Sequence, residues 1–115
     1  MDFSEEIISL SDKLEEVSND FKVACIKYSE HNYNLQKLIG IRIIKMENKK
    51  PSIEKIIAEA VAEDEKTFGL HFKGFEYYRA LKIGLEAQIE ALKSKIMARQ
   101  SVMKWSGKID TYGNV

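Results

Sequence analysis

An apolar residue recurs at alternating steps of four and three along most of this chain, and no other feature constrains the fold as strongly. In the first part of the chain the recurring positions are Phe3, Ile7, Leu10, Leu14, Val17, Phe21, Ala24, Tyr28, His31, Leu35 and Leu38. All of them except His31 are apolar or aromatic. Such a repeat is the a/d seam of a coiled coil, so it predicts a long helix that packs against another helix.

A second seam follows after the only proline, Pro51. Its positions are Phe68, His71, Phe75, Tyr78, Lys82, Leu85, Ile89, Leu92, Ile96, Arg99 and Met103. The polar residues Lys82 and Arg99 are candidates for fixing the register. We therefore expect arm one over residues 4–46 and arm two over 67–105. A tail over 106–115 follows, because Ser106-Gly107 suggests a helix end.

Charge predicts that the two arms run antiparallel. Residues 1–20 hold seven acidic residues and one basic residue, whereas residues 91–115 hold five basic residues and one acidic residue. An antiparallel hairpin lays these segments side by side, whereas a parallel homodimer would stack the acidic segments on each other.

The segment between the arms predicts a short third helix over residues 52–64. Pro51 and Ser52 suit a helix start, and an amphipathic pattern follows at Ile53, Ile56, Ile57, Ala60 and Val61. We expect this helix to pack on the arm ends, at Leu38, Ile39, Ile41, Ile43, Ile44, Met46, Phe68, Leu70, Phe72 and Phe75. The predicted fold is all-α: one domain over residues 1–115, formed by a long antiparallel coiled-coil helical hairpin with a short third helix in the turn.

Composition narrows the function classes. The chain has 18 basic and 18 acidic residues, and a neutral protein is not drawn wholesale to nucleic acid or anionic membrane. It has no apolar run that suggests a membrane anchor. The single cysteine, Cys25, fits a reducing compartment. We therefore expect a cytoplasmic protein without a membrane partner, located in the host cytoplasm if the gene is viral.

Several apolar residues lie off the seams and predict an interface. They are Ile8, Val23, Ile26, Tyr33, Ile83 and Met97, and Trp105 near the end of arm two adds to them. Left in water, such side chains forfeit several kcal/mol of burial free energy (~25 cal/mol per Å² of apolar area). We expect a homo-oligomer, with Ile8, Ile26, Tyr33, Ile83, Met97 and Trp105 at its interface. A monomer whose apolar surface awaits another protein is the alternative.

Candidate metal and catalytic residues are few. His31, His71 and Cys25 are ligand types that zinc accepts, but the antiparallel arrangement places His31 opposite the region of Ala80, away from His71. The acids Glu63, Asp64 and Glu65 are consecutive, so they diverge around a helix and do not converge on a metal ion. We expect no metal, no cofactor and no catalytic residues, and therefore not an enzyme.

Basic residues gather where arm one enters the turn. Lys37, Arg42, Lys45, Lys49 and Lys50 face a single acid, Glu47, within residues 37–50. On one protomer this is an ordinary solvated patch, but in a ring of protomers it would form a belt for a phosphate backbone. Tyr33, Phe72, Tyr77 and Tyr78 are candidates for stacking on single-stranded bases, or for core positions.

Two stretches carry a resemblance to a known family. One is Ser52-Ile53-Glu54-Lys55 at the start of the short helix, and the other is E-Y-Y-R-A-L-K…I-E-A-L-K-S-K-I…Q-S-V-M-K-W over residues 76–105. They resemble small bacteriophage accessory proteins, namely recombination mediators of the UvsY type. The resemblance implies a helical-hairpin oligomer that binds single-stranded DNA beside a recombinase or single-strand-binding protein. The alternative function is a protein-binding module, such as a phage inhibitor, adaptor or assembly chaperone, that acts through its helix faces.

Overall fold

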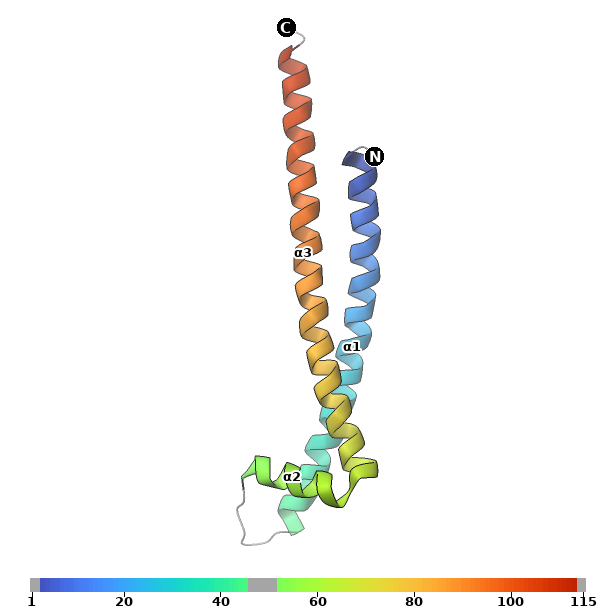
Figure 1. The fold of residues 1–115 in the computed structure, drawn as a ribbon, viewed down its shortest axis with the longest axis vertical. Coiled ribbons are helices and arrows are strands. Elements are labelled where there is room, and N and C mark those ends of the chain that lie inside the picture. The colour runs from blue at the N-terminus through green and yellow to red at the C-terminus, as the bar shows by residue number, and fades with distance from the viewer. Residues whose placement is uncertain (1–2, 46–51, 114–115) are drawn as a thin grey trace. The chain divides into compact units, whose positions relative to one another are not determined.

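Three helices form this protein in a computed structural model that describes residues 3–45 and 52–113, with side chains as far as Trp105. Helix α1 spans Phe3–Lys45, α2 spans Ile53–Glu63 and α3 spans Leu70–Gly113, with a π-helical turn, η1, at Glu65–Gly69 (Figure 1). The long helices α1 and α3 pack antiparallel, and the short α2 lies between them in the chain. The predicted all-α helical hairpin with a third helix in the turn is confirmed.

The helix bounds differ from the expected arms mainly at the C-terminal end. Helix α3 continues through Ser106 and Gly107 as far as Gly113, although those two residues suggest a helix end in the sequence. The chain divides into two compact units, which we describe separately. The terminal unit comprises Met1–Phe21 and Ile83–Val115, and the turn unit comprises Lys22–Lys82.

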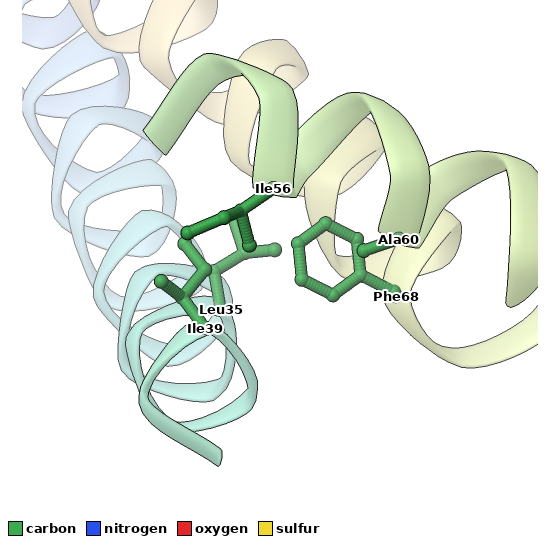
Figure 2. Packing of buried hydrophobic residues seen from close by; sticks show 5 residues of the cluster. All are labelled: Leu35, Ile39, Ile56, Ala60 and Phe68. Atoms are coloured by element: carbon green, nitrogen blue, oxygen red, sulfur yellow. The ribbon is translucent and has the colours of Figure 1, made fainter. Parts of the chain in front are cut away.

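The core of the turn unit is a small apolar cluster to which three segments contribute. Leu35 and Ile39 come from α1, Ile56 and Ala60 from α2, and Phe68 from η1 (Figure 2). Each of these five side chains is at most 6% exposed. A helix as short as α2 is marginal on its own in water, so its contact with α1 and Phe68 through Ile56 and Ala60 accounts for its stability.

A polar side chain caps the start of α2, and another caps the π-helical turn that follows it. The Ser52 hydroxyl accepts a hydrogen bond from the Lys55 N–H at 3.3 Å, which satisfies one of the free donors of the first turn. This confirms the predicted helix start. At the other end the Asp64 carboxylate accepts from the Thr67 N–H at 3.2 Å, and the Asp64 carbonyl accepts from the Gly69 N–H at 3.0 Å. The latter bond spans five residues and closes the π-helical turn.

Only part of the expected apolar surface covers α2. Leu38, Phe72 and Phe75 pack against the cluster as predicted. The prediction is wrong for Ile43, Ile44 and Leu70, which are exposed, as is Ile53 of α2 itself. Ile41 is 39% exposed and lines a hollow between α1 and α2. Helix α2 contacts α1 along one face, so apolar residues on other faces of α1 stay in solvent. Met46 lies outside the described residues.

The register of α1 against α3 in the turn unit also differs from the expectation. His31 lies against His71, with their Nδ1 atoms 3.2 Å apart, instead of opposite Ala80. Tyr28 stacks on Phe75 with ring centroids 5.0 Å apart, and the Lys82 ammonium lies 4.3 Å from the Tyr28 ring centroid. The expectation is wrong because α2 packs on the last turns of α1, so the chain that follows η1 meets α1 further from its C-terminal end.

In the terminal unit the two helices meet along the predicted seam. Val17 is buried, and Leu10, Leu14, Ile89 and Leu92 are half-buried.

An ion pair joins α3 to the first turns of α1. The Arg99 Nε lies 2.8 Å from the Glu6 Oε2. Arg99 of α3 pairs with Glu6, which lies three residues after Phe3, the first described residue of α1. Because the helices are antiparallel, the residues of α3 after Arg99 soon extend past the described part of α1. Val102, Met103 and Trp105 are accordingly exposed.

We predict that truncating two isoleucines of α2 will have unequal effects. Ile56→Ala is expected to lower the free energy of unfolding by about 2–5 kcal/mol, because it leaves a cavity in the cluster. Ile53→Ala is the matched control in the same helix, and it is expected to change that free energy by less than about 0.5 kcal/mol because Ile53 is exposed. Urea unfolding followed by circular dichroism, at one fixed protein concentration, measures both. Equal losses for the two variants would contradict the assignment of Ile56 to the core.

Candidate functional site

The outer face of α1 in the turn unit carries a row of exposed apolar side chains. The row consists of Val23, Ile26, Tyr33, Ile41 and Ile44, which are between 39% and 79% exposed, and we call it the outer stripe. Five helical turns contain 18 residues. Val23 and Ile41 therefore lie along one line of the helix, and Ile26 and Ile44 lie along an adjacent line. Val23, Ile26, Tyr33 and Ile44 lie on the side of α1 opposite the seam positions, whereas Ile41, the least exposed of the five, also lines the hollow between α1 and α2.

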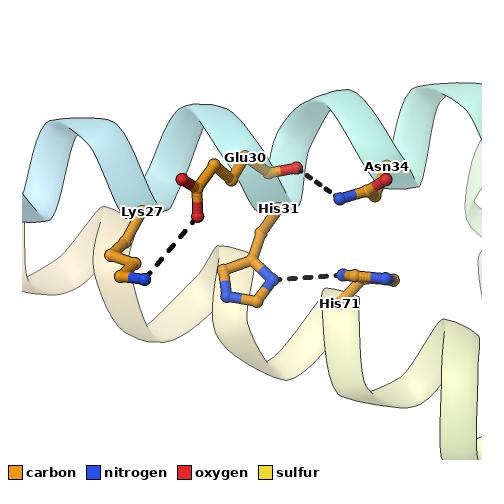
Figure 3. Close-up of polar contacts among 5 residues, drawn as sticks. All are labelled: Lys27, Glu30, His31, Asn34 and His71. Carbon is orange, nitrogen blue, oxygen red and sulfur yellow. Dashed lines mark hydrogen bonds and ion pairs between the residues drawn. The ribbon is translucent and has the colours of Figure 1, made fainter.

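Two oppositely charged residues, Glu30 and Lys37, interrupt the outer stripe. They are spaced by seven residues and lie on either side of Tyr33, and both are exposed. The Glu30 carboxylate lies 3.7 Å from the Lys27 ammonium, one turn earlier on the same helix (Figure 3). An exposed pair of this kind contributes at most about 0.5 kcal/mol, so Glu30 is available to another partner.

The residues that the sequence predicts for an interface are all exposed. They are Ile8, Ile26, Tyr33, Ile83, Met97 and Trp105. Ile26 and Tyr33 belong to the outer stripe, whereas the other four lie in the terminal unit. Sequence reasoning missed Ile41 and Ile44, because it assigned them to the surface beneath α2. Their 18-residue spacing from Val23 and Ile26 is the signal that could have identified them.

The predicted basic patch is only partly available. Lys37 and Lys45 are exposed. The Arg42 Nη1 instead donates to the Glu63 Oε2 of α2 at 3.1 Å, and the Arg42 side chain is 24% exposed. This ion pair lines a hollow of about 370 Å³ between α1 and α2. Lys49 and Lys50 lie outside the described residues.

The four aromatic candidates for base stacking do not form one platform. Tyr33 is exposed on the outer stripe, whereas Phe72 packs against the buried cluster. Tyr78 stacks on His31 with ring centroids 5.7 Å apart, and it makes a T-shaped contact with the exposed Tyr77.

A histidine pair joins α1 to α3 in the turn unit (Figure 3). One Nδ1 donates and the other accepts. The His31 ring also lies directly on the backbone of α3 at Gly74. A β-carbon added at Gly74 would lie 2.5 Å from the His31 Nε2, well inside contact distance. Gly74 therefore permits the close approach that brings the two rings together.

Carboxylates near the turn have local partners. Glu63 pairs with Arg42, and the Asp64 side chain caps η1. Within residues 3–45 and 52–105, no three histidine, cysteine or acidic side chains are arranged to hold a metal ion. Cys25 is a free, half-buried thiol.

A shallow apolar groove of about 390 Å³ lies beside α2. Ile57, Ala58 and Val61 of α2 and Phe72 of α3 line it, with Glu54 at its edge. It is separate from the outer stripe, since none of its lining residues belongs to α1.

Within the described helices no segment is both long and apolar enough to traverse a bilayer. Comparisons with models of protein families, with curated proteins and with solved structures found no match to this chain. The resemblance to recombination mediators stays a prediction.

We predict opposite effects for alanine at two glycines of α3. Gly74→Ala is expected to lower the free energy of unfolding by about 1–3 kcal/mol, because its β-carbon displaces the His31 ring and breaks the hydrogen bond to His71. Gly84→Ala is the control, since, among the described residues, nothing beyond the adjoining backbone of its own helix lies within 4 Å of its added β-carbon. It is expected to stabilise the protein by about 0.5–1 kcal/mol through helix propensity. Thermal and urea unfolding at one protein concentration give both values.

A second background isolates the cause. In a His31→Ala chain the imidazole ring no longer occupies the space of the added β-carbon. Gly74→Ala is then expected to stabilise the protein, as Gly84→Ala does. If Gly74→Ala stabilises the chain that retains His31, the close contact with that ring does not limit residue 74.

Proposed function

We propose that this chain is a non-enzymatic accessory protein that works by associating with protein through its apolar helix faces, first of all with further copies of itself. The observation that carries the proposal is the balance of exposed and buried apolar residues. Among the residues whose side chains are described, sixteen large hydrophobic side chains are exposed, whereas seven hydrophobic residues are buried. Exposed apolar surface that gathers on one face marks an interaction site in soluble proteins.

The arrangement of the exposed residues supports association more than their number does. Single exposed apolar residues are common and need no explanation, but the outer stripe aligns five of them along about 32 Å of one helix. Taking one isoleucine or leucine side chain out of water contributes about 1.5–3 kcal/mol, and association costs about 4–15 kcal/mol in lost freedom. An interface therefore needs several such side chains buried together, which an aligned row provides.

A non-enzymatic role is supported by the local roles of the polar side chains. Ion pairs, a helix cap and the contact between the helices account for Glu6, Arg42, Glu63, Asp64, His31 and His71. The contacts of Glu6, Arg42, Glu63, His31 and His71 join two helices, and that of Asp64 caps the π-helical turn, so each has a structural role.

We predict that the purified chain will have a mass above 13.2 kDa in solution, rising with concentration. Multi-angle light scattering and sedimentation velocity, from low micromolar to millimolar protein, measure it. A 13.2 kDa monomer at every concentration would overturn the proposal of self-association. Association with a different protein would then be the remaining form of the proposal, tested by capture of one stoichiometric partner that survives nuclease treatment.

Binding of single-stranded nucleic acid is the second candidate function. The exposure of Lys37 and Lys45 on α1 favours it, because exposed lysines bind phosphates and release counterions. The ion pair of Arg42 with Glu63 weighs against it, since binding a phosphate would require Arg42 to leave a carboxylate.

We predict that any affinity for a single-stranded oligonucleotide will fall steeply with salt, with a slope that Lys37→Gln and Lys45→Gln each reduce by about 0.7. Fluorescence anisotropy across a salt series measures the slope. Lys13→Gln is the control, since Lys13 belongs to the terminal unit and pairs with Glu16 at 3.5 Å. Absent binding at low salt, or an affinity that does not change with salt, would reject this candidate.

A further inference from the structure

The outer stripe is complementary to a second copy of itself that runs in the opposite direction. From Val23 to Ile44 it reads apolar, apolar, acidic, aromatic, basic, apolar, apolar, at Val23, Ile26, Glu30, Tyr33, Lys37, Ile41 and Ile44. Reading from the other end exchanges the acid for the base and leaves the apolar positions apolar. A two-fold symmetric interface requires this kind of self-complementarity, because each patch meets its own copy in reverse.

We propose that the outer stripe is the interface of an antiparallel homodimer, in which α1 of one protomer packs on α1 of a second copy around a two-fold axis near Tyr33 and Asn34. In this arrangement Val23 and Ile26 of one protomer meet Ile41 and Ile44 of the other. Glu30 of each protomer lies beside Lys37 of the other, and the two Tyr33 rings lie close to the axis. The inference rests on the proposed self-association and specifies where it occurs.

Charge selects the antiparallel orientation. In a parallel pair the two-fold axis would place Glu30 against Glu30 and Lys37 against Lys37, and like charges in an interface are strongly unfavourable. In the antiparallel pair both contacts join opposite charges. Glu30 can leave the Lys27 ammonium, 3.7 Å away, at little cost because that pair is exposed on both sides.

The extent of the stripe indicates a dimer of moderate strength. The stripe spans about 32 Å of a helix roughly 10 Å wide, so one helix pair buries less than the ~1,600 Å² of a standard interface. We therefore expect a reversible dimer whose population changes over the micromolar range. Ile8 and Trp105 belong to the terminal unit and are not part of the stripe.

Charge exchange at Glu30 and Lys37 tests the arrangement. Glu30→Lys and Lys37→Glu each place like charges together twice in the dimer, so each single variant is expected to dimerise about tenfold or more weakly than the unchanged chain. The double variant Glu30→Lys/Lys37→Glu restores both contacts and is expected to recover dimerisation. Mixing the two single variants is expected to yield a heterodimer, because each chain then carries the charge that the other lacks. Sedimentation velocity measures all four states.

Matched controls separate the interface from local helix effects. Glu16→Lys breaks an exposed pair with Lys13 at 3.5 Å, the same kind of contact as Lys27 with Glu30, outside the stripe, and it is expected to leave the dimer unchanged. Ile26→Glu is expected to abolish the dimer. Ile8→Glu, at a residue that is 61% exposed against 59% for Ile26, is expected to preserve it. Circular dichroism confirms that each variant is helical.

The outcomes distinguish this inference from the proposed function. An oligomer that persists unchanged in Ile26→Glu and in both single charge variants would overturn the assignment of the stripe, while self-association itself would stand. A chain that stays monomeric at all concentrations would overturn both. Equal dimerisation of the single and double charge variants would overturn the antiparallel orientation.

Discussion

The contact of Phe68 with Leu35, Ile39, Ile56 and Ala60 is the interaction on which the turn unit depends. These five residues come from α1, α2 and η1, and together they form the buried cluster of the turn unit. Because α2 covers the end of α1, the chain after η1 meets α1 closer to the middle, at Leu35 and His31. The cluster thereby determines both the position of the short helix and the register of the long helices beside it.

Polar and aromatic contacts then hold the helices in that register. In the turn unit His31 bonds to His71, and Lys82 lies over the Tyr28 ring. In the terminal unit Arg99 pairs with Glu6. Apolar seams tolerate slippage by a heptad, whereas each of these contacts is satisfied in one alignment only. The polar residues within the seams therefore select one register of the two helices, which apolar burial alone would not do.

The sequence predicts much of this fold because helical periodicity is a local property. The seams from Phe3 to Leu38 and from Phe68 to Met103 predict the two long helices, and Ser52 predicts the start of α2. The register could not be predicted, since it depends on how α2 packs against α1, which is a tertiary contact. The same limit applies to the candidate interface: Ile26 and Tyr33 are identifiable because they leave the seam, but Ile41 and Ile44 are apolar in a stretch that is apolar on every side. Only the placement of α2 shows which of these residues face solvent.

The approach of His31 to the backbone at Gly74 has a consequence for how this sequence can change over time. A larger residue at position 74 is tolerated only where position 31 has already become smaller, because a β-carbon and the imidazole ring compete for the same volume. A substitution at either position alone lowers the free energy of unfolding, whereas substitutions at both positions change it little. Positions 31 and 74 are therefore expected to covary among descendants of this chain. That covariation would reveal the antiparallel pairing of the two helices without a structure.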